Sequence, residues 1–243
     1  MATALNADTR LKQLEQLIVK LANGQFESDG FRRLLGLRFN RERARVYVLQ
    51  RTHWTVNRRD CWAQVQSLAP LPVKKLIWDH EKDELEGDKE LGKADHYTMS
   101  VQEGAAVGLS PEDFVNLGPS DGCFTCCSAW LHVVKSSHWL SGLAACAALE
   151  LSNSDEILTG GSMSRRMAVK MRDEVGIPFK KQTSNVEHMV ADVKHAHMMM
   201  EVAEHYVRND ADFALVETGL RQSWAIDRIW KGHLADLLAK IPE

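Results

Sequence analysis

Three side chains of types that bind transition metals share one face of a predicted helix toward the C-terminal end of the chain. His188, Asp192 and His195 stand at positions i, i+4 and i+7. At about 100° per residue they project within about 60° of one another. Two imidazoles and one carboxylate suit iron or manganese. Apolar neighbours such as Met189 and Val193 favour an inward-facing stripe, and the alternative is a solvated polar face with accidental spacing.

A fourth candidate ligand is Glu150, which ends the segment G-L-A-A-C-A-A-L-E-L. This segment is almost wholly apolar from Trp139 onward. Burying a carboxylate in such a helix is unfavourable unless the carboxylate is paired or bound to a metal. Glu150 is therefore either a metal ligand in the core or a solvated residue beyond the buried part of its helix.

The third group lies in I-W-D-H-E-K-D-E-L-E-G-D-K-E-L-G-K-A-D-H-Y, residues 77–97. Ile77, Glu81 and Glu84 share one helical face, and His96 opens the following helical segment. One of the two acids together with His96 would supply two more ligands. The alternative is an acid-rich helix end at the surface.

In this order, the candidate residues resemble the pattern of the haem-oxygenase-like diiron oxidases. That family belongs to the superfamily of TenA-like and PqqC-like proteins with the haem oxygenase fold. The resemblance extends over residues 78–199, about half of the chain, and its most specific element is H-x3-D-x2-H. The matching features are Glu81 or Glu84, His96, Glu150, Val175-Gly176-Ile177, and His188, Asp192 and His195.

The resemblance implies two iron ions per chain, with manganese as an alternative metal and O2 as co-substrate. One iron would take His96 and a first-helix glutamate, and Glu150 would bridge. The second iron would be completed by the ligands His188, Asp192 and His195.

The first-helix glutamate departs from the family pattern. In several members it precedes its histidine by seven positions, and here that position is Lys89. The resemblance thus leaves Glu81 and Glu84 as candidates, with Glu86 as a weaker one.

The reactions that the resemblance implies are N-oxygenation, oxidative decarboxylation or C–C cleavage of a small amino acid or carboxylic acid. Formation of para-aminobenzoate from a protein tyrosine is not expected, because Leu149 and Ser184 stand where that reaction would place tyrosines. Arg58 could bind a substrate carboxylate, although packing of this helix in the core with its basic residues at the surface is the favoured explanation. His80 lies one turn from Glu84 and is expected to support ligands rather than to bind metal. The rival hypothesis is a metal-free, heterocycle-binding enzyme of the TenA or PqqC type, or a helical binding scaffold.

The elements that must position these residues are predicted to be helices. Six prolines in 243 residues and few β-branched runs favour an all-α protein. The residues themselves indicate seven or eight helices, and the resemblance implies a single seven-helix up-and-down bundle over residues 1–243, with residues 1–8 disordered. The main predicted helices cover 8–22, 28–68, 73–86, 125–151, 154–176, 184–208 and 211–240.

The composition limits the classes of binding partner that are expected. The net charge of −3 gives no reason to expect nucleic acid or an anionic membrane as partner, so a small-molecule substrate is expected. No apolar run approaches the roughly 20 residues that span a bilayer, and the polar start lacks signal-peptide features, so a cytoplasmic protein is expected. Five irregularly spaced cysteines, including C-x-x-C-C at Cys123, Cys126 and Cys127, are expected to be free thiols. A homodimer is expected from the resemblance.

Overall fold

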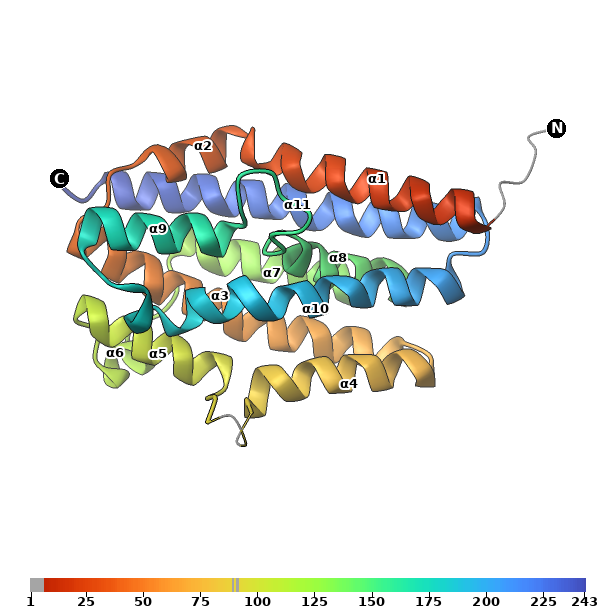
Figure 1. Ribbon diagram of the computed structural model, residues 1–243, viewed down its shortest axis with the longest axis horizontal. Helices are drawn as coiled ribbons and strands as arrows, with labels where there is room; N and C mark the ends of the chain where they lie inside the picture. The colour runs from red at the N-terminus through yellow and green to blue at the C-terminus, as the bar shows by residue number, and fades with distance from the viewer. Residues whose placement is uncertain (1–6, 89, 91) are drawn as a thin grey trace.

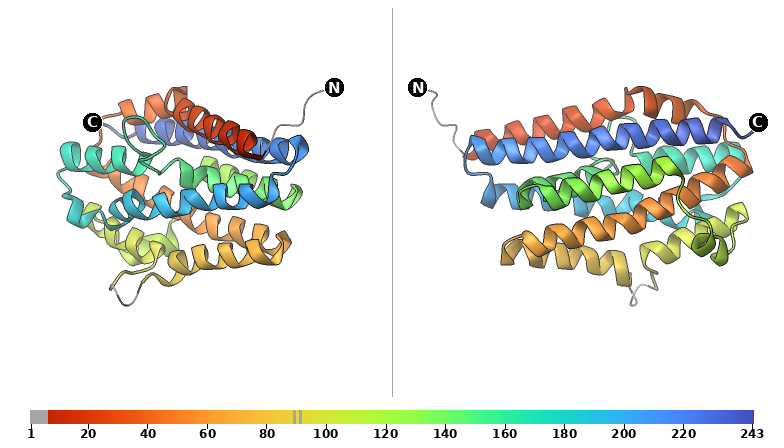
Figure 2. Two further views of the ribbon diagram at one scale, coloured as in Figure 1. Left: turned by 45° about the vertical axis from the view of Figure 1, so that its right-hand side comes forward. Right: turned by 180° about the vertical axis from the view of Figure 1, so that it is seen from behind.

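Long helices running along a common direction make up most of the molecule (Figure 1 and Figure 2). The computed structural model describes residues 7–88, 90 and 92–243, and for residues 7 and 190–196 it describes the backbone only. The described elements are α1 (Ala7–Phe26), α2 (Asp29–Gly36), α3 (Arg41–Leu68), α4 (Leu71–Glu86), α5 (His96–Val107), α6 (Pro111–Asn116), α7 (Asp121–Ser136), α8 (Trp139–Leu151), α9 (Met163–Val175), η1 (Phe179–Lys181), α10 (Thr183–Tyr206) and α11 (Asp210–Ala239).

The all-α prediction is confirmed, because the described part of the chain contains no β-strand beyond an isolated bridge between Asp88 and Lys93. The predicted number of helices is wrong: the described chain forms twelve helical segments rather than seven. The first helix begins earlier than expected, since Ala7 and Asp8 are already helical. Residues 1–6 lie outside the described part. No helix within the described residues is long and apolar enough to cross a membrane.

Local capping explains the additional segments. The predicted helix over 28–68 is interrupted at residues 37–40, where the Asn40 side chain accepts a hydrogen bond from the Arg43 amide and starts α3. The predicted helix over 125–151 is interrupted between Ser136 and Trp139, where His138 accepts from the Leu140 amide and starts α8. Residues 154–162 form turns, so α9 starts at Met163 with Ser162 as its cap.

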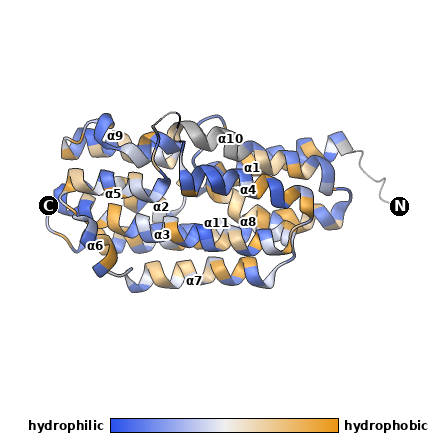
Figure 3. Ribbon diagram, turned by 90° about the horizontal axis from the view of Figure 1, so that it is seen from below, coloured by the Kyte–Doolittle hydropathy of each residue, from blue (hydrophilic) through white to orange (hydrophobic). Residues whose placement is uncertain are grey.

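Helix α8 is the central element of the core. All of its residues from Leu140 to Leu151 are buried, and it packs against α7, α10 and α11. Its many small residues allow close packing, and at Gly219 of α11 the helix backbones are so close that a Cβ atom would overlap the Ser141 carbonyl oxygen. The outer helices carry both hydrophobic and hydrophilic residues (Figure 3), as expected for helices that bury one side.

Helix ends bring the candidate ligands into one region. Gly87, with φ of 66°, ends α4 shortly after Glu84, and Asp95 caps α5 so that His96 is its first residue. Glu150 lies at the C-terminal end of α8. Helix α10 packs against α4, α5 and α8, and therefore places His188 beside these ends.

The close contact between α8 and α11 predicts that Gly219→Ala destabilises the protein. Overpacking costs about 1–3 kcal/mol, which outweighs the gain of about 1 kcal/mol in helix propensity. The control is Gly24→Ala in α1, where an added Cβ meets nothing within 4 Å and only the propensity gain remains. Urea unfolding measures both variants, and a Gly219→Ala protein as stable as Gly24→Ala would contradict this packing.

Candidate metal centre

Four of the predicted ligands are buried together inside the bundle. The exposed fraction is 7% for Glu81, 3% for Glu84, 1% for His96 and 4% for Glu150. They come from three helices, α4, α5 and α8. The structure therefore excludes a solvated surface position for these four residues. Glu86, the weaker candidate, is exposed at the end of α4.

Glu84 and His96 form the tightest pair among the candidate ligands. Glu84 Oε2 lies 2.9 Å from His96 Nδ1. Both ring nitrogens of His96 are buried without a hydrogen bond of good geometry among the described residues. Nδ1 has the contact with Glu84, and Nε2 has no described polar contact. An unsatisfied buried nitrogen is rare in proteins, and a metal ion would satisfy this one.

His188 joins this pair from α10. The His188 and His96 rings meet edge to face, with centroids 4.7 Å apart. A buried network one turn before His188 fixes the start of α10. The backbone nitrogen of Asn185 donates to Glu103 Oε2 over 3.0 Å, and Arg51 Nη2 lies 3.1 Å from Glu103 Oε1. This network ties α10 to α3 and α5 and so sets the position of His188.

The side chains of Asp192 and His195 lie outside the described residues, as does Lys89. The backbone of α10 is helical throughout Thr183–Tyr206. Asp192 and His195 therefore follow His188 along the same helix.

His80 connects the α4 carboxylates to Glu150. Its Nδ1 lies 3.0 Å from Glu81 Oε1 and its Nε2 lies 3.6 Å from Glu150 Oε1. Burial by itself lowers the pKa of His80, but its contacts with Glu150 and Glu81 outweigh burial and raise the pKa to about 9. His80 is therefore a cation between two carboxylates at neutral pH. The sequence-based expectation of a supporting role agrees with these contacts.

Two adjacent arginines of α3 supply the remaining positive charge. Arg58 Nη2 donates to Glu150 Oε1 and, over 3.1 Å, to the Cys146 carbonyl oxygen. Arg59 Nη1 lies 3.1 Å from Glu81 Oε1 and 2.6 Å from Glu84 Oε2. Burial raises the pKa of Glu84, but the Arg59 charge and the contact with His96 outweigh burial and hold that pKa well below its usual range.

The chemistry of this donor set fits iron. Imidazole and carboxylate ligands are those that non-haem iron sites use. Within the described side chains, however, no three His, Cys, Asp or Glu residues already stand together as a ready group of metal ligands. The contacts explain this, because Glu81, Glu84 and Glu150 are turned toward Arg58, Arg59 and His80.

Arg59 was not identified from the sequence as part of the site, and Arg58 has a different partner in the structure from the one that the sequence suggested. Arg58 was considered as a binder of substrate carboxylate, whereas its partner is Glu150. The signal that could have found both is their place within a long helix whose neighbours Cys61 and Trp62 are apolar and buried. A basic pair in such a helix requires buried acids opposite it.

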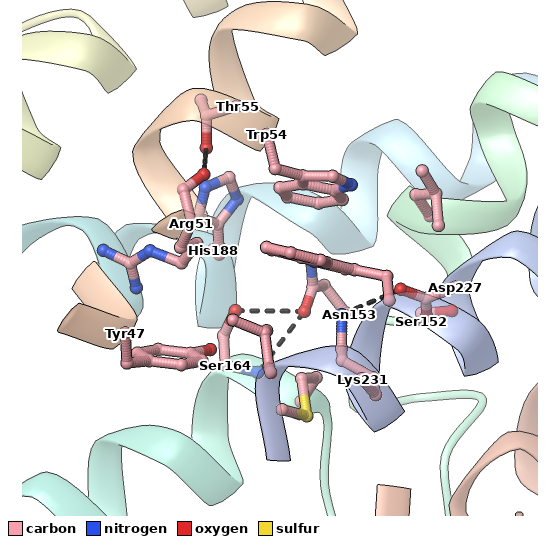
Figure 4. Close-up of a pocket in the computed structure, with 14 residues that line it drawn as sticks. Tyr47, Arg51, Trp54, Thr55, Ser152, Asn153, Ser164, His188, Asp227 and Lys231 are labelled. Atoms are coloured by element: carbon pink, nitrogen blue, oxygen red, sulfur yellow. Dashed lines mark hydrogen bonds and ion pairs between the residues drawn. The ribbon is translucent and has the colours of Figure 1, made fainter. Parts of the chain in front are cut away.

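A small cavity of ≈ 40 Å³ adjoins the candidate centre at His188 (Figure 4). It contains a buried ion pair, Lys231 Nζ to Asp227 Oδ1 at 2.8 Å. Burial raises the pKa of Tyr47, which also lines it, to about 12, so this phenol stays neutral. The other lining residues are Arg51, Trp54, Thr55, Leu149, Ser152, Asn153, Met163, Ser164, Trp230 and Leu234.

The five cysteines are free, and all but Cys127 are buried. Burial raises the pKa of Cys61 to about 12 and that of Cys126 to about 11. These thiols are protonated at neutral pH and are poor nucleophiles.

Comparison with known proteins gives a family and a fold. The sequence profile of a family described as iron-containing redox enzyme matches residues 45–228. No curated protein matches the sequence significantly.

Several solved structures share the fold. A domain of unknown function with a haem oxygenase-like fold from Shewanella denitrificans OS217 is 15% identical, with a TM-score of 0.71 over 95% of this chain and 92% of that one. A CADD-like protein of unknown function from Nostoc punctiforme PCC 73102 is also 15% identical, with a TM-score of 0.71 over 95% and 97%. A TenA homologue from P. horikoshii OT3 is 18% identical, with a TM-score of 0.59 over 94% and 100%. At these identities the likeness shows the fold alone, which is haem oxygenase-like.

The buried pair of Arg58 and Glu150 predicts a large effect of Arg58→Ala on the metal-free protein. Removing one partner of a buried ion pair leaves the other charge uncompensated, at a cost of about 3–5 kcal/mol. Arg172→Ala is the control, because Arg172 pairs with Asp173 at the surface, where solvent screens an ion pair and its contribution to stability is small. Urea unfolding compares the two variants. Equal, small losses of stability would show that Arg58 does not compensate Glu150.

Proposed function

Because the chain belongs to the family of iron-containing redox enzymes, we propose that it is a non-haem diiron enzyme that uses O2 to oxidise a small organic substrate. One observation carries the proposal: Glu81, Glu84, His96 and Glu150 are buried together beside His188. Burying three carboxylates in a helical bundle is unfavourable unless each carboxylate is paired with a cationic side chain or binds a metal ion.

The proposed ligands fall into two groups. His96 with Glu84 or Glu81 would hold one iron, and Glu150 would supply a further carboxylate to the same centre. The second site takes its ligands from α10, which are His188, Asp192 and His195. When bound, two ferrous ions would supply the electrons that O2 requires.

Other residues of the chain orient the ligands. Arg58 fixes the Glu150 carboxylate from the α3 side, and His80 holds Glu81 and Glu150 toward one another. Trp62 covers His80 with a ring-centroid distance of 4.8 Å and is fully buried. Orientation by such neighbours and exclusion of water are what a protein contributes to metal-based oxidation.

The substrate site proposed here is the cavity at His188. Lys231 and Arg51 offer positive charge to a carboxylate, and Asp227 offers negative charge to an ammonium group. These charges suit a small amino acid or carboxylic acid, undergoing N-oxygenation, oxidative decarboxylation or C–C cleavage. A cavity of ≈ 40 Å³ holds little more than water, so binding requires the lining side chains to move.

A second candidate function is a metal-free enzyme that binds a heterocycle, or a binding scaffold. It is favoured by the contacts of Arg58, Arg59 and His80, which balance the buried carboxylates without metal. The aromatic walls that Trp54 and Trp230 give the cavity would suit a flat ring. Metal content separates the two candidates.

For the protein produced with iron, the diiron proposal predicts two irons per chain. Elemental analysis after removal of loosely bound metal measures this number. The ferrous protein should also consume O2 with a change in absorbance, and a screen of amino and carboxylic acids should identify compounds that accelerate consumption. Protein that folds fully and retains no iron after such production would support the metal-free candidate instead.

Substitutions on α4 test the first site. Glu84→Ala is expected to lose more iron than Glu81→Ala, because Glu84 contacts His96 whereas Glu81 contacts His80. His188→Ala or Asp192→Ala should abolish activity and reduce iron while the helical content stays near wild type.

The matched control on the same helix is Glu86→Ala, since Glu86 is exposed, and Lys89→Ala should also change little. Iron content and circular dichroism are measured on each variant. Full iron in Glu84→Ala, or an empty site in Lys89→Ala, would show that the ligands on α4 are assigned wrongly.

A further inference from the structure

Arg59 stands where two proposed ligands converge. A single atom, Nη1, lies within ion-pair distance of both Glu81 Oε1 (3.1 Å) and Glu84 Oε2 (2.6 Å). Glu84 Oε2 in turn contacts His96. The guanidinium group therefore supplies positive charge beside both of the glutamates that are candidates for the first iron ligand.

The two carboxylates need this charge whenever iron is absent. Glu81 and Glu84 are buried on adjacent turns of α4, and two anions so close repel each other strongly in a medium of low dielectric constant. His80 contacts Glu81, but Arg59 is the cation that contacts both. Without Arg59 or a metal ion, the two α4 carboxylates would lose the described cation that contacts both of them, and their mutual repulsion would increase.

Arg58 and Arg59 differ in how they are held. Arg58 donates to the Cys146 carbonyl oxygen as well as to Glu150, and its side chain is 6% exposed. Arg59 Nε and Nη1 are buried without a hydrogen bond of good geometry among the described residues, and its side chain is 14% exposed. Arg59 is thus held mainly by charge and lies nearer to solvent, whereas Arg58 is anchored to backbone.

We infer that Arg59 is a displaceable counter-charge, which neutralises Glu81 and Glu84 in the metal-free protein and leaves them for solvent when iron binds. This inference rests on the proposed function. Because one atom, Arg59 Nη1, contacts both oxygens, an iron ion bound to either oxygen would lie close to the guanidinium charge, and the two cations would repel each other. Arg58 keeps its bonds to Glu150 and Cys146 in both states.

Iron binding is then an exchange of one cation for another. Its free energy is the gain from the metal–ligand bonds minus the loss of the Arg59 contacts. Removing the arginine charge should consequently tighten iron binding and, at the same time, destabilise the metal-free protein. A residue that merely packs in the core would weaken both.

The test compares Arg59→Gln and Arg59→Lys with the wild type, and uses Arg58→Gln as the matched control on the neighbouring residue. Anaerobic titration with Fe2+ gives the dissociation constant, and urea unfolding gives the midpoint of the metal-free protein. Arg59→Gln should bind Fe2+ at least about tenfold more tightly and unfold at lower urea, because a buried carboxylate pair has lost its counter-charge. Arg59→Lys, which keeps the charge, should lie between Arg59→Gln and the wild type in both measurements. Arg58→Gln should lower the midpoint without tightening Fe2+ binding.

The outcomes separate the inference from the function on which it rests. If wild type binds Fe2+ and Arg59→Gln binds it equally or more weakly, the displacement is refuted and the diiron proposal stands. If neither the wild type nor any variant binds Fe2+, the diiron proposal fails. A lowered midpoint in Arg59→Gln would in that case identify Arg59 as a permanent structural cation, which also overturns the inference.

Discussion

A carboxylate inside a helical bundle must have a cation beside it, and this requirement organises the centre of the molecule. Glu81, Glu84 and Glu150 are each buried, and the described structure compensates them with Arg58 and Arg59. Apolar residues of similar volume would give an equally stable core. We therefore expect the buried carboxylates to have a function that acids at the surface could not serve. The chain belongs to a family of iron-containing redox enzymes, and under the proposed function that use is to bind iron.

The buried acids come together because several helices begin or end inside the bundle. The ends of α4 and α8 and the start of α5 lie against α10, so ligands that are far apart in sequence become neighbours. The small residues of α8 let it pack closely against its neighbours, which brings Glu150 into the core rather than to its rim. His188 also lines the cavity that holds Lys231 and Asp227, which is the proposed substrate site.

The burial of Glu84 and Glu150 could be inferred from sequence as one of two alternatives, because an acid on an apolar stripe is either buried with a partner or solvated at a helix end. The pairing of the compensating arginines is harder to predict, since they lie 22 to 92 positions from their partners in sequence and basic residues on helices are usually solvated. The breaks at residues 37–40 and around Ser137 were missed for a different reason. Neither contains Gly or Pro, and they depend on side-chain caps, which apolar periodicity does not reveal.

The central claim is that the buried carboxylates and histidines constitute an iron site. It is tested most directly by a crystal structure of protein loaded with Fe2+ under anaerobic conditions, with anomalous diffraction recorded on both sides of the iron absorption edge. The account predicts two iron peaks, one bound by His96 and an α4 glutamate and one bound by His188, with Glu150 between them. A loaded crystal without anomalous density at these residues, in which Arg59 still contacts Glu81 and Glu84, would contradict it.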